Sequence, residues 1–254
     1  MIAAAARVGL VVPSGNPVVE PELHRLLDPE LFPYTARFPV HADGDLASRL
    51  DRYVDDLPAV IATLRPLGPA AAFVACTGSS YPLGVDGDRS WAAAAAEVVG
   101  APVGTAAGAV AEVLARLGAD RIRIVSPYPA WLTDQCERYW RSSGLRVMGV
   151  HQVDGSGDVG HSVYDTPGSA VATAIERAID ASSPLDGRDD AVVIAGTGVA
   201  TLDVLDRLAA ESDVTVVSSN LAGAWWLLAT ASPGSVTSSA AGPALTRLLE
   251  RASR

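Results

Sequence analysis

The sequence contains no lysine, and all 19 of its basic residues are arginines. Without lysine, the chain cannot form the Schiff base used by pyridoxal phosphate enzymes and lysine aldolases, and it cannot supply the lysine of a Walker phosphate-binding loop. Cysteine is also scarce, because only Cys76 and Cys136 occur in 254 residues. Two distant cysteines in a chain of this size do not indicate a disulfide framework. We expect Cys136 to pack inside an amphipathic helix.

Several common sites are missing as well. The histidines show no spacing typical of metal ligands; they are His24, His41, His151 and His161. No Gly-x-Ser-x-Gly sequence marks a hydrolase nucleophile. The segment Gly196-Thr-Gly198 follows a strand pattern, but the third glycine of a dinucleotide-binding fingerprint is absent. The sequence therefore gives no signal for a metal site and argues against a nicotinamide cofactor.

Charge and hydropathy limit the partners. The formal net charge is −10, which argues against binding to nucleic acid or to anionic membranes. No apolar run is long enough to span a membrane. Arg7 interrupts an N-terminal stretch that lacks the pattern of a signal peptide. We therefore expect a cytoplasmic enzyme or binding protein.

Apolar strand patterns alternate with helical patterns along the whole chain, which predicts an α/β fold with parallel sheets. The expected strands are 7–12, 33–40, 70–75, 101–103, 121–126, 145–150, 190–195 and 214–217. One expected helix begins at Glu20, and the others are 46–64, 90–99, 105–117, 131–142, 169–181, 202–211, 221–229 and 243–252. Residues 151–168 are rich in Gly, Asp and Ser without periodicity, which favours a mobile loop or lid.

The most informative stretch is Phe73-Val-Ala-Cys-Thr-Gly-Ser-Ser-Tyr81. Small residues directly after a buried strand let the backbone turn and expose its N–H groups. A thiol at Cys76 would then lie among donors able to hold an anion. The alternative is a structural cysteine, because free cysteine is often buried. The local sequence leaves both interpretations open.

Two further strand ends carry candidate residues. Asn16 follows the first strand, at the edge where open α/β sheets bind ligands, although asparagine is also common in plain turns. The strand that ends at Gly196 in the second half matches the strand that ends at Cys76 in the first half. This weak internal symmetry predicts two lobes that face each other across one cleft. A hydrolase that pairs Cys76 with His41 or His161 is a further alternative.

Four stretches together resemble the aspartate/glutamate racemase superfamily, and within it the maleate cis–trans isomerase and arylmalonate decarboxylase branch. They are Gly9-Leu-Val-Val-Pro-Ser-Gly-Asn16 with Glu20-Pro-Glu22, Ala75-Cys-Thr-Gly-Ser-Ser80, Ser126-Pro-Tyr128, and Val216-Val-Ser-Ser-Asn220 followed by Trp225. The resemblance implies two flavodoxin-like lobes with parallel sheets, related by a pseudo-twofold axis, and a site in the cleft between them. The first lobe would hold residues 1–108 and 218–254, and the second lobe residues 109–217.

The resemblance also implies a cofactor-free reaction through thiols, and it assigns the catalytic thiol to Cys76. Family members use a pair of thiols, but at the position of the second thiol this chain has Gly196. The decarboxylase has the mirror arrangement, with its single thiol on the second lobe and glycine on the first. Racemisation by two bases needs a proton acceptor on one face of the substrate and a proton donor on the other, so a site with one thiol is poorly suited to it. We expect an isomerase-like reaction of a maleate-like dicarboxylate. Decarboxylation of an arylmalonate, or carboxylate binding without turnover, remains an alternative.

The substrate contacts follow from the same resemblance. Asn16 and Asn220 would hold one carboxylate, and hydroxyl and N–H donors would stabilise an enediolate at the other. The further contact residues are Thr77, Gly78, Ser79, Ser80, Tyr128, Gly196, Thr197 and Gly198, where Gly78 replaces a hydroxyl residue of the family. With no adjacent arginine, only helix dipoles and N–H groups would lower the pKa of Cys76 and speed its alkylation. By analogy with other two-lobed proteins, we expect a homodimer or a higher homo-oligomer.

Overall fold

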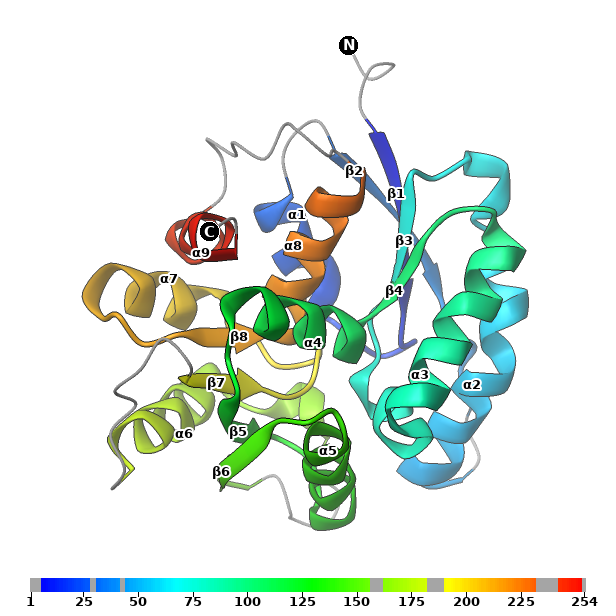
Figure 1. The fold of residues 1–254 in the computed structure, drawn as a ribbon. Coiled ribbons are helices and arrows are strands. Elements are labelled where there is room, and N and C mark those ends of the chain that lie inside the picture. Colours follow the sequence, from blue (N-terminus) through cyan, green and yellow to red (C-terminus); the bar gives the residue numbers. More distant parts are fainter. Residues whose placement is uncertain are drawn as a thin grey trace.

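The computed structural model describes residues 6–27, 31–41, 44–155, 162–181, 190–231 and 242–252. Within these ranges, the strands form two four-stranded sheets with the orders β2-β1-β3-β4 and β6-β5-β7-β8. Every strand pair in both sheets is parallel. The two halves share one connectivity, so the expected pair of flavodoxin-like parallel α/β lobes is confirmed (Figure 1).

The central strands are short apolar runs that helices cover on both faces. The strands are β1 (Ala6–Val12), β2 (Leu31–Arg37), β3 (Ala71–Val74), β4 (Val103–Thr105), β5 (Arg121–Ser126), β6 (Arg146–Gln152), β7 (Asp190–Ile194) and β8 (Val216–Ser218). Every residue of β3 and β7 is buried. Burial on both faces explains why these strands read as continuous apolar runs rather than as alternating patterns.

The helices connect successive strands and cover the sheets. They are α1 (Val19–Leu26), α2 (Leu46–Ala62), α3 (Thr77–Val99), α4 (Ala106–Leu117), α5 (Ala130–Ser142), α6 (Gly168–Asp180), α7 (Leu202–Glu211), α8 (Ser219–Ala231) and α9 (Pro243–Ala252), with 3-10 turns η2 (Arg65–Leu67) and η3 (Val163–Asp165). None of the helices in the described ranges is long and apolar enough to cross a membrane.

Helix α8 returns the chain to the first lobe, where it packs against α1, α4 and β3 (Figure 1). This close packing requires Gly223, because a Cβ atom there would lie 2.4 Å from Cζ of Phe73. Helix α9 packs against both α7 and α8. The exact lobe boundaries at residues 108 and 218 stay a prediction.

Helix α3 begins earlier than the sequence pattern predicts. The pattern indicates a helix from Ser90, whereas α3 begins at Thr77, directly after Cys76. Pro82 and Gly84 interrupt the helical pattern, and Gly84 has the non-helical angles φ 68° and ψ 176°. A kink at Gly84 therefore joins two helices, and the first of them points its N-terminus at the end of β3.

Candidate active site

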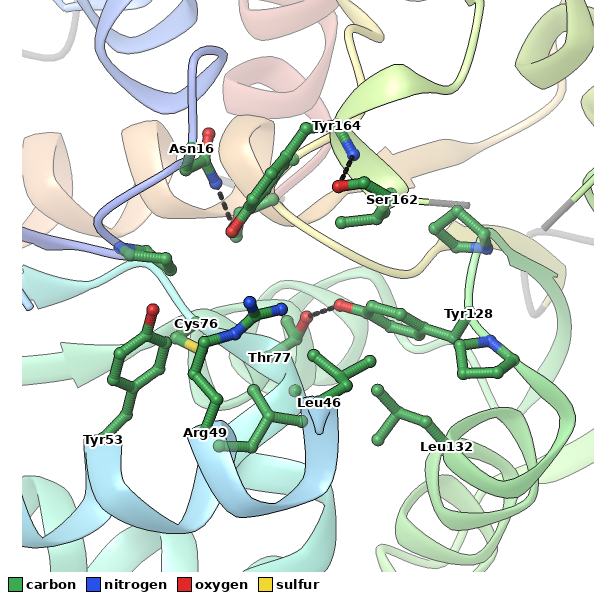
Figure 2. Close-up of a pocket in the computed structure, with 18 residues that line it drawn as sticks. Asn16, Leu46, Arg49, Tyr53, Cys76, Thr77, Tyr128, Leu132, Ser162 and Tyr164 are labelled. Carbon is green, nitrogen blue, oxygen red and sulfur yellow. Dashed lines mark hydrogen bonds between the residues drawn. The ribbon is translucent and has the colours of Figure 1, made fainter. Parts of the chain in front are cut away.

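A cavity of about 380 Å³ lies at the carboxyl ends of the central strands of both sheets. The segments that follow β1, β3, β5 and β7 all reach it, together with one face of α2 and the turn η3 (Figure 2). Its lining residues are Pro13, Asn16, Leu46, Arg49, Leu50, Tyr53, Cys76, Thr77, Gly78, Pro127, Tyr128, Pro129, Leu132, Ser162, Val163, Tyr164, Thr197 and Gly198. This position is the one at which open parallel sheets bind ligands.

Cys76 lies at the N-cap of α3 and is only 5% exposed. Its Sγ is 3.4 Å from Oγ of Ser79, and the Ser79 hydroxyl donates to the Leu50 carbonyl at 3.0 Å. Because this hydroxyl has one proton, the S–H group of a neutral Cys76 donates to Ser79. When Cys76 is a thiolate, the Ser79 hydroxyl can turn its proton to the sulfur instead. The site can therefore accommodate both charge states of the thiol.

Burial is the largest influence on the Cys76 thiol, and it raises the pKa of Cys76 above its usual value. Hydrogen bonds from Ser79 and Gly78 and the positive charge of Arg49 oppose the effect of burial without cancelling it. Two expectations from the sequence are thus wrong. The pKa of the thiol is raised in the ligand-free protein, and an arginine does act on it, brought close by α2.

We expect iodoacetamide to alkylate Cys76 more slowly than it alkylates glutathione at neutral pH. Because the raised pKa leaves Cys76 mostly as the neutral thiol, the alkylation rate should increase about tenfold per pH unit. This increase should continue to pH values above the pKa of an ordinary thiol. Mass spectrometry of the Cys76 peptide would measure the rate. Cys136, fully buried and with its pKa raised by burial to about 12, is the internal control that should stay unmodified. A rate that levels off below a pH of about 8.5 would contradict the raised pKa.

A pair of hydroxyl groups crosses the cavity beside Cys76. Oγ1 of Thr77 and the Tyr128 hydroxyl lie 2.6 Å apart and come from different lobes (Figure 2). Burial raises the pKa of Tyr128 well above the neutral range, so its hydroxyl keeps its proton and can donate. Tyr128 also lies against Gly196, where a Cβ atom would be 3.1 Å from the Tyr128 hydroxyl. Gly196 has a φ of 92°, so the Tyr128 hydroxyl occupies the space beside the position of the missing second thiol.

Asn16 links the two lobes at the opposite wall. Its Nδ2 donates to Oγ1 of Thr197 at 3.2 Å, and Thr197 donates to the Ala75 carbonyl at 2.8 Å. Its Oδ1 accepts from the N–H groups of Val18 and Val19, which fixes the start of α1. Arg37 holds the same turn through the carbonyls of residues 13, 14 and 16.

The cavity brings together most of the residues predicted from the sequence, but not all of them. Those that line it are Asn16, Cys76, Thr77, Gly78, Tyr128, Thr197 and Gly198. Four others lie just behind the wall: Ser79 bonds the thiol, Ser80 bonds the Cys76 carbonyl, Gly196 contacts Tyr128, and Asn220 donates to Glu22 and to the Thr197 carbonyl. The substrate-binding role of each residue stays a prediction.

Sequence reasoning missed the residues that approach the cavity from outside the strand ends. Leu46, Arg49, Leu50 and Tyr53 form one face of α2, and their i, i+3, i+4, i+7 spacing was the available signal. Tyr164 comes from the 151–168 segment, of which residues 156–161 lie outside the described part. The ring of Tyr164 packs against the turns that hold Gly15 and Gly198. A Cβ atom on Gly198 would lie 2.6 Å from the ring.

The hydrolase alternative receives no support from the described residues. His41 bonds to Asp56 at 2.6 Å and does not line the cavity. His161 lies outside the described residues. None of the described lining residues is a histidine, so none can act as the imidazole base of a Cys–His pair.

The fold and the cavity define a two-lobed parallel α/β protein with a thiol in the cleft between its lobes. The chain belongs to the arylmalonate decarboxylase family, whose model matches residues 8–243. No curated protein sequence matches the chain at a significant level.

Solved structures share this fold over nearly the whole chain. A cysteine-to-serine mutant of Nocardia farcinica maleate cis–trans isomerase, with a covalently bound succinylcysteine intermediate, has a TM-score of 0.79 and 24% identity, covering 96% of this chain and 99% of that one. The maleate isomerase of Pseudomonas putida has a TM-score of 0.71 and 23% identity over 88% and 92% of the two chains. An arylmalonate decarboxylase double mutant, in which one glycine is changed to cysteine and one cysteine to serine, has a TM-score of 0.76 and 21% identity. The match covers 91% of this chain and 94% of that one.

Proposed function

We propose that the protein is a cofactor-independent isomerase of a small cis-unsaturated dicarboxylate, with Cys76 as its nucleophile. The observation that carries the proposal is the position of the thiol. Cys76 lies at a helix N-terminus, opens into a cavity of about 380 Å³, and adjoins the paired hydroxyls of Thr77 and Tyr128. A nucleophile and donors for a developing oxyanion thus line one cavity.

The reaction balances with a single thiol. The Cys76 thiolate adds to one alkene carbon and forms a C–S bond, and the π electrons move onto the carboxylate of the neighbouring carbon as an enediolate. The former double bond is now single and can rotate. Elimination then breaks the C–S bond, restores the alkene in the trans form and returns the thiolate. No net proton transfer is needed, so the absence of a second thiol at Gly196 is compatible with this reaction.

Thr77 and Tyr128 would stabilise the enediolate. Their paired hydroxyls, one from each lobe, line the same cavity as Cys76, and the raised pKa of Tyr128 keeps its hydroxyl a donor. Donors that are fixed before the reaction and directed at developing charge contribute strongly to catalysis. The Nocardia farcinica relative offers a parallel, because a cysteine-to-serine mutant of that isomerase carries a succinylcysteine adduct.

Decarboxylation is the second candidate, and the raised pKa of Cys76 favours it. After loss of CO2 from a substituted malonate, an enediolate accepts one proton, which a neutral thiol can donate. The family model bears the name of arylmalonate decarboxylase. The decarboxylase double mutant also gained a cysteine at a glycine and lost one at a cysteine, a combination comparable to Cys76 with Gly196.

Proton NMR in D2O would distinguish the candidates. We expect maleate to yield fumarate without deuterium incorporation, and methyl- and phenylmalonate to stay unchanged. Because the nucleophile is a thiolate with a raised pKa, kcat/KM for isomerisation should increase with pH across the neutral range. A deuterated monoacid, formed at a rate that stays level through neutral pH and falls above the raised pKa, would instead establish decarboxylation. Fumarate formation that survives in Cys76→Ala would refute the proposal.

The cellular setting is part of the same proposal. Both cysteines are free and buried, and a nucleophilic thiol works in a reducing compartment. We therefore retain the cytoplasm as the expected location. The homodimer or higher homo-oligomer stays a prediction, which size-exclusion chromatography with light scattering would test.

A further inference from the structure

Arg49 is the only charged side chain among the described residues that line the cavity, apart from the titratable thiol. It lies in the second turn of α2, on the face that also presents Leu46, Leu50 and Tyr53 to the cavity. Figure 2 shows the side chain pointing from α2 into the cavity, on the side that carries Cys76. The local sequence therefore places a guanidinium inside the site.

Neither ion pairing nor helix stability explains this position. In the part of the chain that the structure describes, the side chain of Arg49 makes no hydrogen bond or ion pair, so its guanidinium has free donors. By contrast, nine arginines pair with Asp or Glu within the described residues: Arg25, Arg37, Arg89, Arg121, Arg141, Arg146, Arg177, Arg207 and Arg251. A cation near the N-terminal end of a helix is also unfavourably placed in the helix dipole. A bound anion would account for Arg49.

The surroundings of Arg49 form a second polar site beside the sulfur. Burial raises the pKa of Tyr164 and of Cys76, and the charge of Arg49 opposes both effects, so the guanidinium is within electrostatic reach of both groups. The Tyr164 hydroxyl also makes no hydrogen bond with a described residue. Arg49 comes from the first lobe and Tyr164 from η3 of the second, so the two lobes together direct a cation and a hydroxyl donor into one space.

We propose that Arg49, assisted by Tyr164, binds a second carboxylate of the substrate, one that is kept throughout the reaction. This inference rests on the proposed function, because it takes the first carboxylate to lie at Thr77 and Tyr128. A guanidinium binds a carboxylate through two parallel charge-assisted hydrogen bonds. Both anion sites then lie in the same cavity as Cys76, and Figure 2 shows the Arg49 guanidinium near the paired hydroxyls of Thr77 and Tyr128.

The charge on Arg49 also selects between substrate classes. When a malonate loses CO2, the departing carboxylate must give up its negative charge to the enediolate. A guanidinium paired with that carboxylate would stabilise the ground state and raise the barrier. A carboxylate on a different carbon keeps its charge in substrate, adduct and product. Arg49 therefore fits an unsaturated dicarboxylate with its carboxylates on separate carbons, and it disfavours a malonate.

Binding of unreactive analogues would test this inference without turnover. Succinate and propionate differ by one carboxylate, and neither has an alkene that a thiolate could attack. We expect calorimetry to show that Arg49→Met weakens succinate binding by about 10- to 100-fold and leaves propionate binding unchanged. Arg49→Lys should recover part of the loss, because it restores the charge without the paired geometry. Arg52→Met, on the same helix but away from the cavity, is the control that should bind both ligands normally.

The outcomes separate this inference from the proposed function. Arg49-dependent succinate binding, in a protein that does not isomerise maleate, would retain the carboxylate site and refute the isomerase. Equal succinate binding by wild type and Arg49→Met, or no succinate binding by wild type at millimolar concentration, would overturn the inference. So would an Arg49→Met variant that slows only the alkylation of Cys76, because Arg49 would then act on the thiol and not on the ligand.

Discussion

The Cys76→Ser variant is expected to lose at least about 10³-fold in kcat for maleate. A serine hydroxyl can keep the hydrogen bond to Ser79 and the position at the N-cap of α3. Its pKa is far higher than that of a thiol, however, so almost no alkoxide is available to attack the alkene. Because the shape of the site is retained, KM should change only a few-fold. Steady-state kinetics at several pH values would separate the two parameters.

Two controls make this result specific to the thiol at residue 76. Cys136→Ala removes the other cysteine, which lies on the buried face of α5 and does not line the cavity. This variant should retain the kcat of the wild type. Circular dichroism of both variants would show that the fold is kept. A Cys76→Ser variant that keeps more than about a tenth of kcat would mean that the sulfur takes no part in the chemistry. The family fold would be unaffected by that outcome.

Much of the fold could be predicted from the sequence because its elements carry strong local signals. The strand 121–126 and the helices 202–211 and 243–252 have the bounds that their apolar patterns predict. The start of α3 could not be predicted in this way, since Pro82 and Gly84 weaken its helical pattern, and its N-cap residue Cys76 makes no side-chain capping hydrogen bond of the kind that a sequence can signal.

The residues of the candidate site also fall into two groups, those that local sequence signals and those that only tertiary packing brings to the cavity. Asn16, Cys76 and Thr197 directly follow buried strands, and parallel strands bring their carboxyl ends to one edge. Local sequence is therefore enough to bring them together. Arg49 and Tyr164 reach the cavity only because α2 and η3 pack over that edge, and this packing depends on the whole chain. The raised pKa of Cys76 likewise depends on burial, which the neighbouring sequence does not fix.

Glu22 is the second residue for which a large effect is expected, this time on stability. It is a buried carboxylate on α1 of the first lobe, 6% exposed. Its Oε1 accepts from the N–H groups of Thr201 and Leu202 at 2.6 and 2.8 Å, at the start of α7 in the second lobe. Its Oε2 accepts from Nδ2 of Asn220 at 2.8 Å, and the same amide donates to the Thr197 carbonyl. One carboxylate thus caps a helix, joins the lobes and supports the turn that lines the cavity.

We expect Glu22→Ala to lower the free energy of unfolding by about 3–5 kcal/mol. The substitution leaves two buried backbone N–H groups and one of the two amide hydrogens of Asn220 without an acceptor, and it removes the charge that favours the N-terminus of α7. Glu22→Gln should cost less, because one side-chain oxygen still accepts from the two N–H groups. Urea unfolding followed by circular dichroism would measure the midpoints.

The matched control is Asp203→Ala, on α7, the helix whose N-terminus Glu22 caps. Asp203 forms an ion pair with Arg25 on the protein surface, where its side chain is 88% exposed, so its loss should change stability by no more than about 0.5 kcal/mol. If Glu22→Ala were as mild as this control, the carboxylate would not hold the lobes together. If it is as severe as expected, the displaced Thr197 turn should also lower kcat/KM for the reaction at Cys76. Stability and catalysis would then share one buried residue, because the cleft is built from groups on both lobes.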